Sequence, residues 1–188
     1  MEPSALMKEQ HLRAVLSHAA GVPSSSAEVS ETISALRPPT HAGLIACIAD
    51  SSLLFSSWWK SAVLPAVEAT RKAGLRARQH AAYFGATSYD KKEYFEIFKA
   101  AASELGFADD QIVHVSEANA RSHIELVGHR SALVLLSGGD TAAGWNAMES
   151  SGLANAVRRA ALEGAVVVGV AAGAVQMGLS GYGMRSVA

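Results

Sequence analysis

The sequence lacks most of the features that mark disulfide-bonded, membrane-spanning or nucleic-acid-binding proteins. Its one cysteine, Cys47, cannot form a disulfide within the chain, so a reducing, cytoplasmic compartment is expected. Charged residues make up 18% of the chain and the net charge is -1, which provides no basic surface for nucleic acid or an anionic membrane. The longest apolar run, from Ala165 to Val175, has 11 residues, and a bilayer-spanning helix needs about 20. No signal peptide is predicted at the N-terminus.

Apolar residues make up 49% of the 188 residues, and after His41 they follow the pattern of alternating strands and helices. Apolar segments of strand length are found at 43–49, 81–85, 111–116, 132–136 and 165–170. Segments with helical spacing separate them, at 56–73, 88–106, 118–129 and 141–163. This alternation predicts an α/β fold with a mainly parallel, doubly wound sheet flanked by helices.

Two interruptions and one boundary are predicted within this pattern. Pro65 should break or restart the helix near Leu64, and the helical region 141–163 should break near 150–152. Residues 1–41 are predicted to form an N-terminal helix and a Ser/Pro-rich linker, and residues 42–188 the α/β domain.

Two of the predicted strands end in glycine-rich segments. In open parallel sheets, ligands bind at the carboxyl ends of the strands, which is where these segments lie. The first segment is Leu136-Ser137-Gly138-Gly139-Asp140-Thr141, which is also compatible with a plain tight turn that Asp140 caps. The second is Gly169-Val170-Ala171-Ala172-Gly173-Ala174, at the junction of a strand and a helix. Its spacing differs from G-x-G-x-x-G and matches a nucleophile elbow, in which small residues flank the side chain on a strained turn.

Taken in order, these segments and the Ser151-Gly152-Leu153 step between them resemble the dipeptidase E and cyanophycinase group of serine peptidases. This group shares the α/β fold of class I glutamine amidotransferases. The resemblance implies a hydrolase that acts on peptides, in particular on acidic dipeptides. It implies the following sites: the nucleophile position at Ala171; the elbow glycines Gly169 and Gly173; an oxyanion hole from Gly139, Asp140 and Ala172; and substrate contacts from Asp140 and Thr141.

The chain departs from this family at the residues that perform the chemistry. Ala171 stands where the family has its nucleophilic serine, and a methyl group cannot attack a carbonyl. The family's histidine and acid come after the elbow, but the residues after Ala171 include no histidine, aspartate or glutamate. Cys47 lies on the first predicted strand, so it does not replace the nucleophile. The chain is therefore expected to be catalytically inactive and C-terminally truncated relative to the family.

Two other interpretations remain open at this point. The chain could be an active-site mutant or fragment of a working serine peptidase, or a nucleotide- or anion-binding module that uses Gly138–Thr141 at a helix N-terminus. No metal site is expected, because the seven histidines lack the paired spacings of zinc ligands, and no cofactor is expected. A homodimer is expected, because a shortened sheet would expose an unpaired edge.

Overall fold

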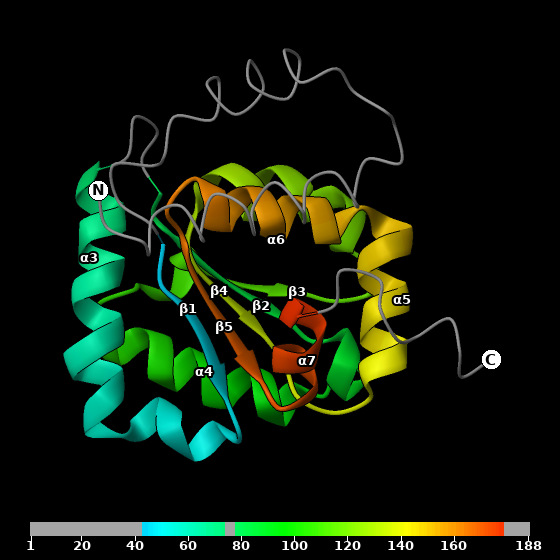
Figure 1. Ribbon diagram of the computed structural model, residues 1–188, viewed down its shortest axis with the longest axis horizontal. Helices are drawn as coiled ribbons and strands as arrows, with labels where there is room; N and C mark the ends of the chain where they lie inside the picture. The colour runs from blue at the N-terminus through cyan, green and yellow to red at the C-terminus, as the bar shows by residue number, and fades with distance from the viewer. Residues whose placement is uncertain (1–42, 74–77, 179–188) are drawn as a thin grey trace, which may run out of the picture. The chain divides into compact units, whose positions relative to one another are not determined.

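The computed structural model describes residues 43–73 and 78–178, so the predicted helix and linker of 1–41 lie outside this range. Five strands form one parallel sheet in the order β1-β5-β4-β2-β3 (Figure 1). The strands are β1 (Ile45–Ile48), β2 (His80–Phe84), β3 (Ile112–Val115), β4 (Ser131–Leu136) and β5 (Val166–Val170). Both the predicted fold class and the parallel sheet are confirmed.

Helices cover both faces of the sheet, because side chains of the central strands point alternately to one face and the other. Tyr83 of β2 lies in the same core as Val67 of α3 (Leu64–Ala73) and Phe98 of α4 (Lys92–Glu104), and these two helices cover this face of the sheet (Figure 1). Phe84, the next residue, lies in the core on the opposite face, together with Ala156 of the covering helix α6 (Leu153–Leu162). The α-helices are α3 (Leu64–Ala73), α4 (Lys92–Glu104), α5 (Thr141–Ser151), α6 (Leu153–Leu162) and α7 (Ala172–Gly178).

Short 3₁₀ and π turns connect these elements. The 3₁₀ turns are η1 (Ser51–Phe55), η3 (Ala86–Ser88), η4 (Asp109–Gln111) and η5 (Ala120–His123), and the π turns are η2 (Trp59–Val63) and η6 (Leu126–Arg130). None of the helices in the described part of the chain is long and apolar enough to cross a membrane.

The helix that contains Pro65 changes its type at Leu64, as its proline suggests, but it is not interrupted. The π turn η2 leads directly into α3, and the N–H of Leu64 donates to the carbonyl of Trp59, five residues earlier. Proline has no N–H and its ring collides with the preceding turn of a regular α-helix. The wider π turn provides the room that the ring needs, so the chain stays helical.

The helix predicted over 118–129 is wrong in type. This segment consists of the 3₁₀ turn η5, two α-helical residues and the π turn η6, which ends where β4 begins. Two side chains from outside the segment donate hydrogen bonds to carbonyls near its end. Ser131 Oγ donates to the carbonyl of Leu126, and the buried guanidinium of Arg78 donates to the carbonyl of Gly128. Periodicity cannot report these partners, because they come from other parts of the chain.

Candidate functional site

The turn after β5 has the backbone geometry of a nucleophile elbow. Ala171 has a φ of +45°, in the left-handed region that residues with a Cβ rarely adopt. Its N–H donates to Ile48 of β1 at 2.9 Å, and its carbonyl accepts from Ala174 at 3.0 Å, in the first turn of α7. Ala171 itself is exposed, so a side chain at this position points to solvent rather than into the core.

The two glycines beside Ala171 are required by close packing around this turn. A Cβ on Gly169 would lie 2.6 Å from the amide nitrogen of Ala174. A Cβ on Gly173 would lie 2.2 Å from the carbonyl oxygen of Leu136, at the end of β4. Any larger residue would move α7 away from the sheet, so Gly169 and Gly173 hold the strand and helix in the sharp turn expected of an elbow.

The glycine turn after β4 lies directly beside the elbow, since β4 and β5 are neighbours in the sheet. A Cβ built on Gly138 would lie 3.4 Å from the Cβ of Ala171. Gly139 has a φ of +134°, and a Cβ there would lie 2.2 Å from the carbonyl oxygen of Thr87. The two turns that the sequence analysis identified therefore meet at one point.

Asp140 is held by two sets of hydrogen bonds. Its Oδ1 accepts from the amides of Ala142 and Ala143 at 2.9 and 3.0 Å, so it caps α5, and its Oδ2 accepts from the Tyr89 hydroxyl at 2.8 Å. The Ala143 amide, followed by the Tyr89 hydroxyl, lowers the pKa of the Asp140 carboxyl group. Asp140 is thus a carboxylate at neutral pH.

Two of the expected site roles need correction. The backbone N–H of Asp140 donates to the carbonyl of Thr87 at 2.7 Å, so it is not free to bind an oxyanion. Thr141 is not among the described residues that line the pocket at this site, and its carbonyl accepts from Gln176 Nε2 at 3.1 Å. The other two expected oxyanion donors stay a prediction: Gly139 lines the pocket, and the N–H of Ala172 lies in the first turn of α7, where it has no partner within the helix.

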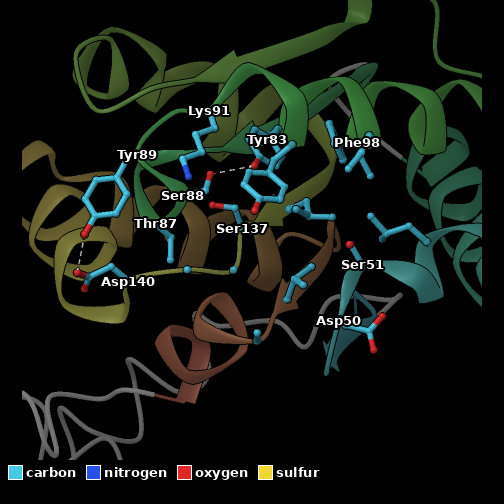
Figure 2. Close-up of a pocket in the computed structure, with 18 of the residues that line it drawn as sticks. Asp50, Ser51, Tyr83, Thr87, Ser88, Tyr89, Lys91, Phe98, Ser137 and Asp140 are labelled. Carbon is cyan, nitrogen blue, oxygen red and sulfur yellow. Dashed lines mark hydrogen bonds between the residues drawn. The ribbon is translucent and has the colours of Figure 1, made fainter.

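A pocket of about 420 Å³ opens beside the two turns (Figure 2). It is bounded by η1, the end of β2 with η3, the first half of α4, the turn after β4, and the elbow. Among its lining residues are Tyr83, Ser88, Lys91, Phe98 and Ser137. The predicted residues Gly139, Asp140 and Ala171 also line it, so the pocket belongs to the expected site.

The contribution of β2 and η3 to the pocket was not predicted from the sequence. Tyr83 is buried, and its hydroxyl lies 3.3 Å from Ser88 Oγ, which in turn donates to the carbonyl of Gly85. Burial raises the pKa of the Tyr83 phenol, against the opposing effects of the Ser88 and Ser137 hydroxyls. The signal that could have found them is the polar run from Thr87 to Asp90, directly after a predicted strand.

The described histidines lie outside this pocket. His114 of β3 stacks on Phe95 with ring centroids 4.8 Å apart, and its Nε2 is 3.4 Å from Asp90 Oδ1. None of the described residues that line the pocket is a histidine. Within residues 43–73 and 78–178, no group of three or more His, Cys, Asp or Glu residues could hold a metal ion.

Comparisons with known proteins bear on the family and the fold of this chain. The sequence model of peptidase family S51 matches residues 72–185, which include both glycine turns. The crystal structure of a peptidase from an acI-B1 actinobacterium matches with a TM-score of 0.56 and 16% identity, over 72% of this chain and 56% of that one. A candidate peptidase E protein from Listeria monocytogenes EGD-e matches with a TM-score of 0.44 and 12% identity, over 70% of this chain and 59% of that one. No curated protein matches the chain.

The structural match to the actinobacterial peptidase supports the fold, and this chain spans little more than half of that protein's length. The family match supports a stronger conclusion than the structural match, because it covers more than half of the chain and contains the residues that build the elbow. The chain therefore belongs to peptidase family S51.

Proposed function

We propose that this protein is a member of peptidase family S51 that binds peptides beside the elbow without hydrolysing them. The observation that carries the proposal is Ala171. It has the strained backbone of the nucleophile position, it is exposed, and it lines the pocket, but its side chain is a methyl group. In a serine triad, loss of the nucleophile alone lowers turnover by about 10⁶.

Among the described residues of the pocket, no hydroxyl lies beside a histidine that could make it a nucleophile. Ser137 carries a hydroxyl into the pocket, but the group that interacts with it is the Tyr83 phenol, whose pKa burial raises, and not a base. A serine hydroxyl at its ordinary pKa is a weak nucleophile, and it needs an adjacent base to become reactive. Histidine is the usual base, and the described lining residues include none.

The parts of the site that bind rather than react are retained. We assign a peptide carbonyl to the amides of Gly139, which lines the pocket, and of Ala172, which follows the elbow residue Ala171 in the chain; Asp140 also lines the pocket. A protein with such a pocket and no nucleophile would bind a peptide and release it intact.

The variant Ala171→Ser tests this proposal. We expect the parent and the variant to react equally slowly with a fluorophosphonate probe, because the new hydroxyl has no base beside it. Ala174→Ser, one turn away on α7, is the matched control for adding a serine. A positioned general base contributes at least about a hundredfold. If labelling of Ala171→Ser alone rises by that factor, the protein is a serine peptidase with one residue changed and the proposal fails.

A further inference from the structure

The buried part of the pocket beside the elbow is uncharged. Of its lining residues, those buried in the fold are apolar, aromatic or hydroxyl-bearing: Leu54, Tyr83, Phe98, Leu135, Ser137 and Val170 are examples. Among the described lining residues, the charged ones are all exposed, and they are Asp50, Lys91 and Asp140. The charge that the described residues bring to the pocket thus lies at its mouth.

One hydroxyl in the buried part has hydrogen-bonding capacity to spare. Ser137 is 3% exposed, and its hydroxyl lies near enough to that of Tyr83 to lower the pKa of the phenol, but its Oγ has no well-formed hydrogen bond to any described residue. Figure 2 shows Ser137 beside Tyr83, whose own hydroxyl contacts Ser88. A buried polar atom without a partner costs free energy, and a ligand with a polar group at this depth would remove that cost.

The walls around this hydroxyl suit an aromatic ring. Tyr83 and Phe98 lie side by side, with ring centroids 5.4 Å apart and planes tilted by 32°. Aromatic rings in such offset and tilted arrangements attract one another beyond the effect of buried area. The volume of about 420 Å³ lies within the range of small-molecule sites and leaves room for a large side chain.

The mouth disfavours an acidic ligand group. Hydrogen bonds from the hydroxyl and amide of Ser52 lower the pKa of Asp50, and that of Asp140 is lowered as well, so both are carboxylates at neutral pH. They outnumber Lys91, the one cation among the described lining residues. A ligand carboxylate would have to pass this mouth and then lose its water in an uncharged interior. An ammonium group at a peptide N-terminus would instead be attracted to the mouth.

We propose that the pocket takes an uncharged, polar-tipped aromatic side chain of a peptide, with tyrosine as the best fit, rather than the acidic side chain that the family resemblance implies. This inference rests on the proposed function, because it names the peptide class that the same site binds. The ring would lie against Tyr83 and Phe98, its hydroxyl would pair with Ser137 Oγ, and the peptide N-terminus would face one of the two carboxylates, Asp50 or Asp140, which lie on opposite sides of the pocket (Figure 2).

The test is calorimetric titration of the full chain with dipeptides that carry tyrosine, phenylalanine, glutamine or glutamate beside an alanine, in both orders. We expect tyrosine to bind at least tenfold more tightly than glutamate, and glutamine more tightly than glutamate, which has the same size. One neutral hydrogen bond is worth about 0.5–1.5 kcal/mol, so Ser137→Ala should weaken tyrosine binding by about 2- to 13-fold and leave phenylalanine unchanged. Ser103→Ala, on the exposed surface of α4, is the matched control.

The outcomes separate this inference from the proposed function. Tighter binding of glutamate than of glutamine would overturn the inference, while peptide binding itself would stand. An equal loss of tyrosine and phenylalanine binding in Ser137→Ala would also overturn it, since the hydroxyl would then have no special partner. No binding of any of the dipeptides by the folded protein would overturn the proposed function.

Discussion

At the scale of single residues, Ala171 combines a costly backbone conformation with an inert side chain. A residue with a Cβ in the left-handed region is destabilised by about 1–2 kcal/mol relative to ordinary conformations. The turn is nevertheless held by hydrogen bonds to β1 and α7 and by the two glycines beside it. The elbow is thus maintained by its neighbours, and its geometry does not depend on a reactive group at its tip.

The first prediction concerns the close contact between α7 and β4. Gly173→Ala would bring a methyl group against the carbonyl oxygen of Leu136, where a Cβ would lie at 2.2 Å. We expect a loss of about 1–3 kcal/mol in the free energy of unfolding, the usual cost of overpacking. Urea denaturation followed by circular dichroism would measure it as a lower midpoint. Gly178→Ala is the control, because a Cβ there meets nothing within 4 Å; if both variants lose the same stability, the close packing at the elbow is not what matters.

The second prediction concerns the pH dependence that Asp140 contributes. Its pKa in the folded protein lies below the ordinary 3.8, so it binds its proton more weakly in the folded than in the unfolded state. The stabilisation that the Asp140 carboxylate contributes is therefore fully present above the pKa that Asp140 has in the unfolded state. It is lost as the pH falls through the lower pKa that Asp140 has in the folded state. We expect the melting temperature of Asp140→Ala to be lower than that of the parent at pH 6, and the difference to shrink below about pH 4.

Asp140→Asn is the matched control for this pH effect, because its amide oxygen still caps α5 but does not titrate between pH 2 and 7. Its melting temperature should approach that of the parent as the pH falls. A parent–Ala difference that stays constant from pH 6 to pH 2 would contradict the role of the charge.

The residues of the site were predictable to different degrees. Gly169, Gly173 and Ala171 could be placed from sequence because an elbow has a local pattern of small residues around one position. Ser88 belongs to a polar run after a strand and carried a usable signal, but Tyr83 could not be placed, because its position in the pocket depends on β2 lying next to β4, which no local pattern reports. The hydrogen bond from the Asp140 amide could not be predicted for the same reason, since its acceptor, the carbonyl of Thr87, belongs to the segment after β2.

At the scale of elements, strand positions and helix breaks were predicted better than helix type. The break near 150–152 is confirmed: Gly152 has a φ of +84° and separates α5 from α6. Glycine followed by helical spacing is a local signal, so the sequence carries it. The mixed turns of 120–130 depend on which carbonyls find distant donors, and periodicity holds no such information. The π turn before Pro65 is a local adjustment to the proline ring, and a hydrophobic pattern does not specify this type of turn.

The third prediction tests the backbone requirement at the α5–α6 junction. A Cβ on Gly152 would meet only Ile124 Cδ1, at 3.4 Å, so the cost of Gly152→Ala is conformational rather than steric. We expect a loss of about 1 kcal/mol in the free energy of unfolding, and a smaller loss for Gly152→Asn, because asparagine tolerates the left-handed region. Thermal unfolding of the two variants would measure this. Equal losses in both would point to crowding instead.

At the scale of the whole molecule, the expected homodimer remains a prediction. In the described part of the chain β1 pairs with β5 alone, and it exposes Cys47 and Ile45, which is 60% exposed. An edge strand with exposed apolar side chains favours pairing with another chain. We expect light scattering to show a dimer at micromolar concentration and Ile45→Lys to shift it toward monomer, whereas Ser103→Lys on α4 should not. A monomeric parent protein would contradict this expectation.

The central claim is that the site binds peptides and does not cleave them, and one NMR experiment tests both halves. The full chain is incubated with tyrosyl-alanine, saturation transfer from protein to peptide reports binding, and the peptide resonances are followed for a day. The account predicts saturation transfer and an intact peptide. Cleavage that increases with protein concentration would contradict it, as would saturation transfer to a nucleotide such as AMP with none to any dipeptide, since the glycine turn would then serve anion binding.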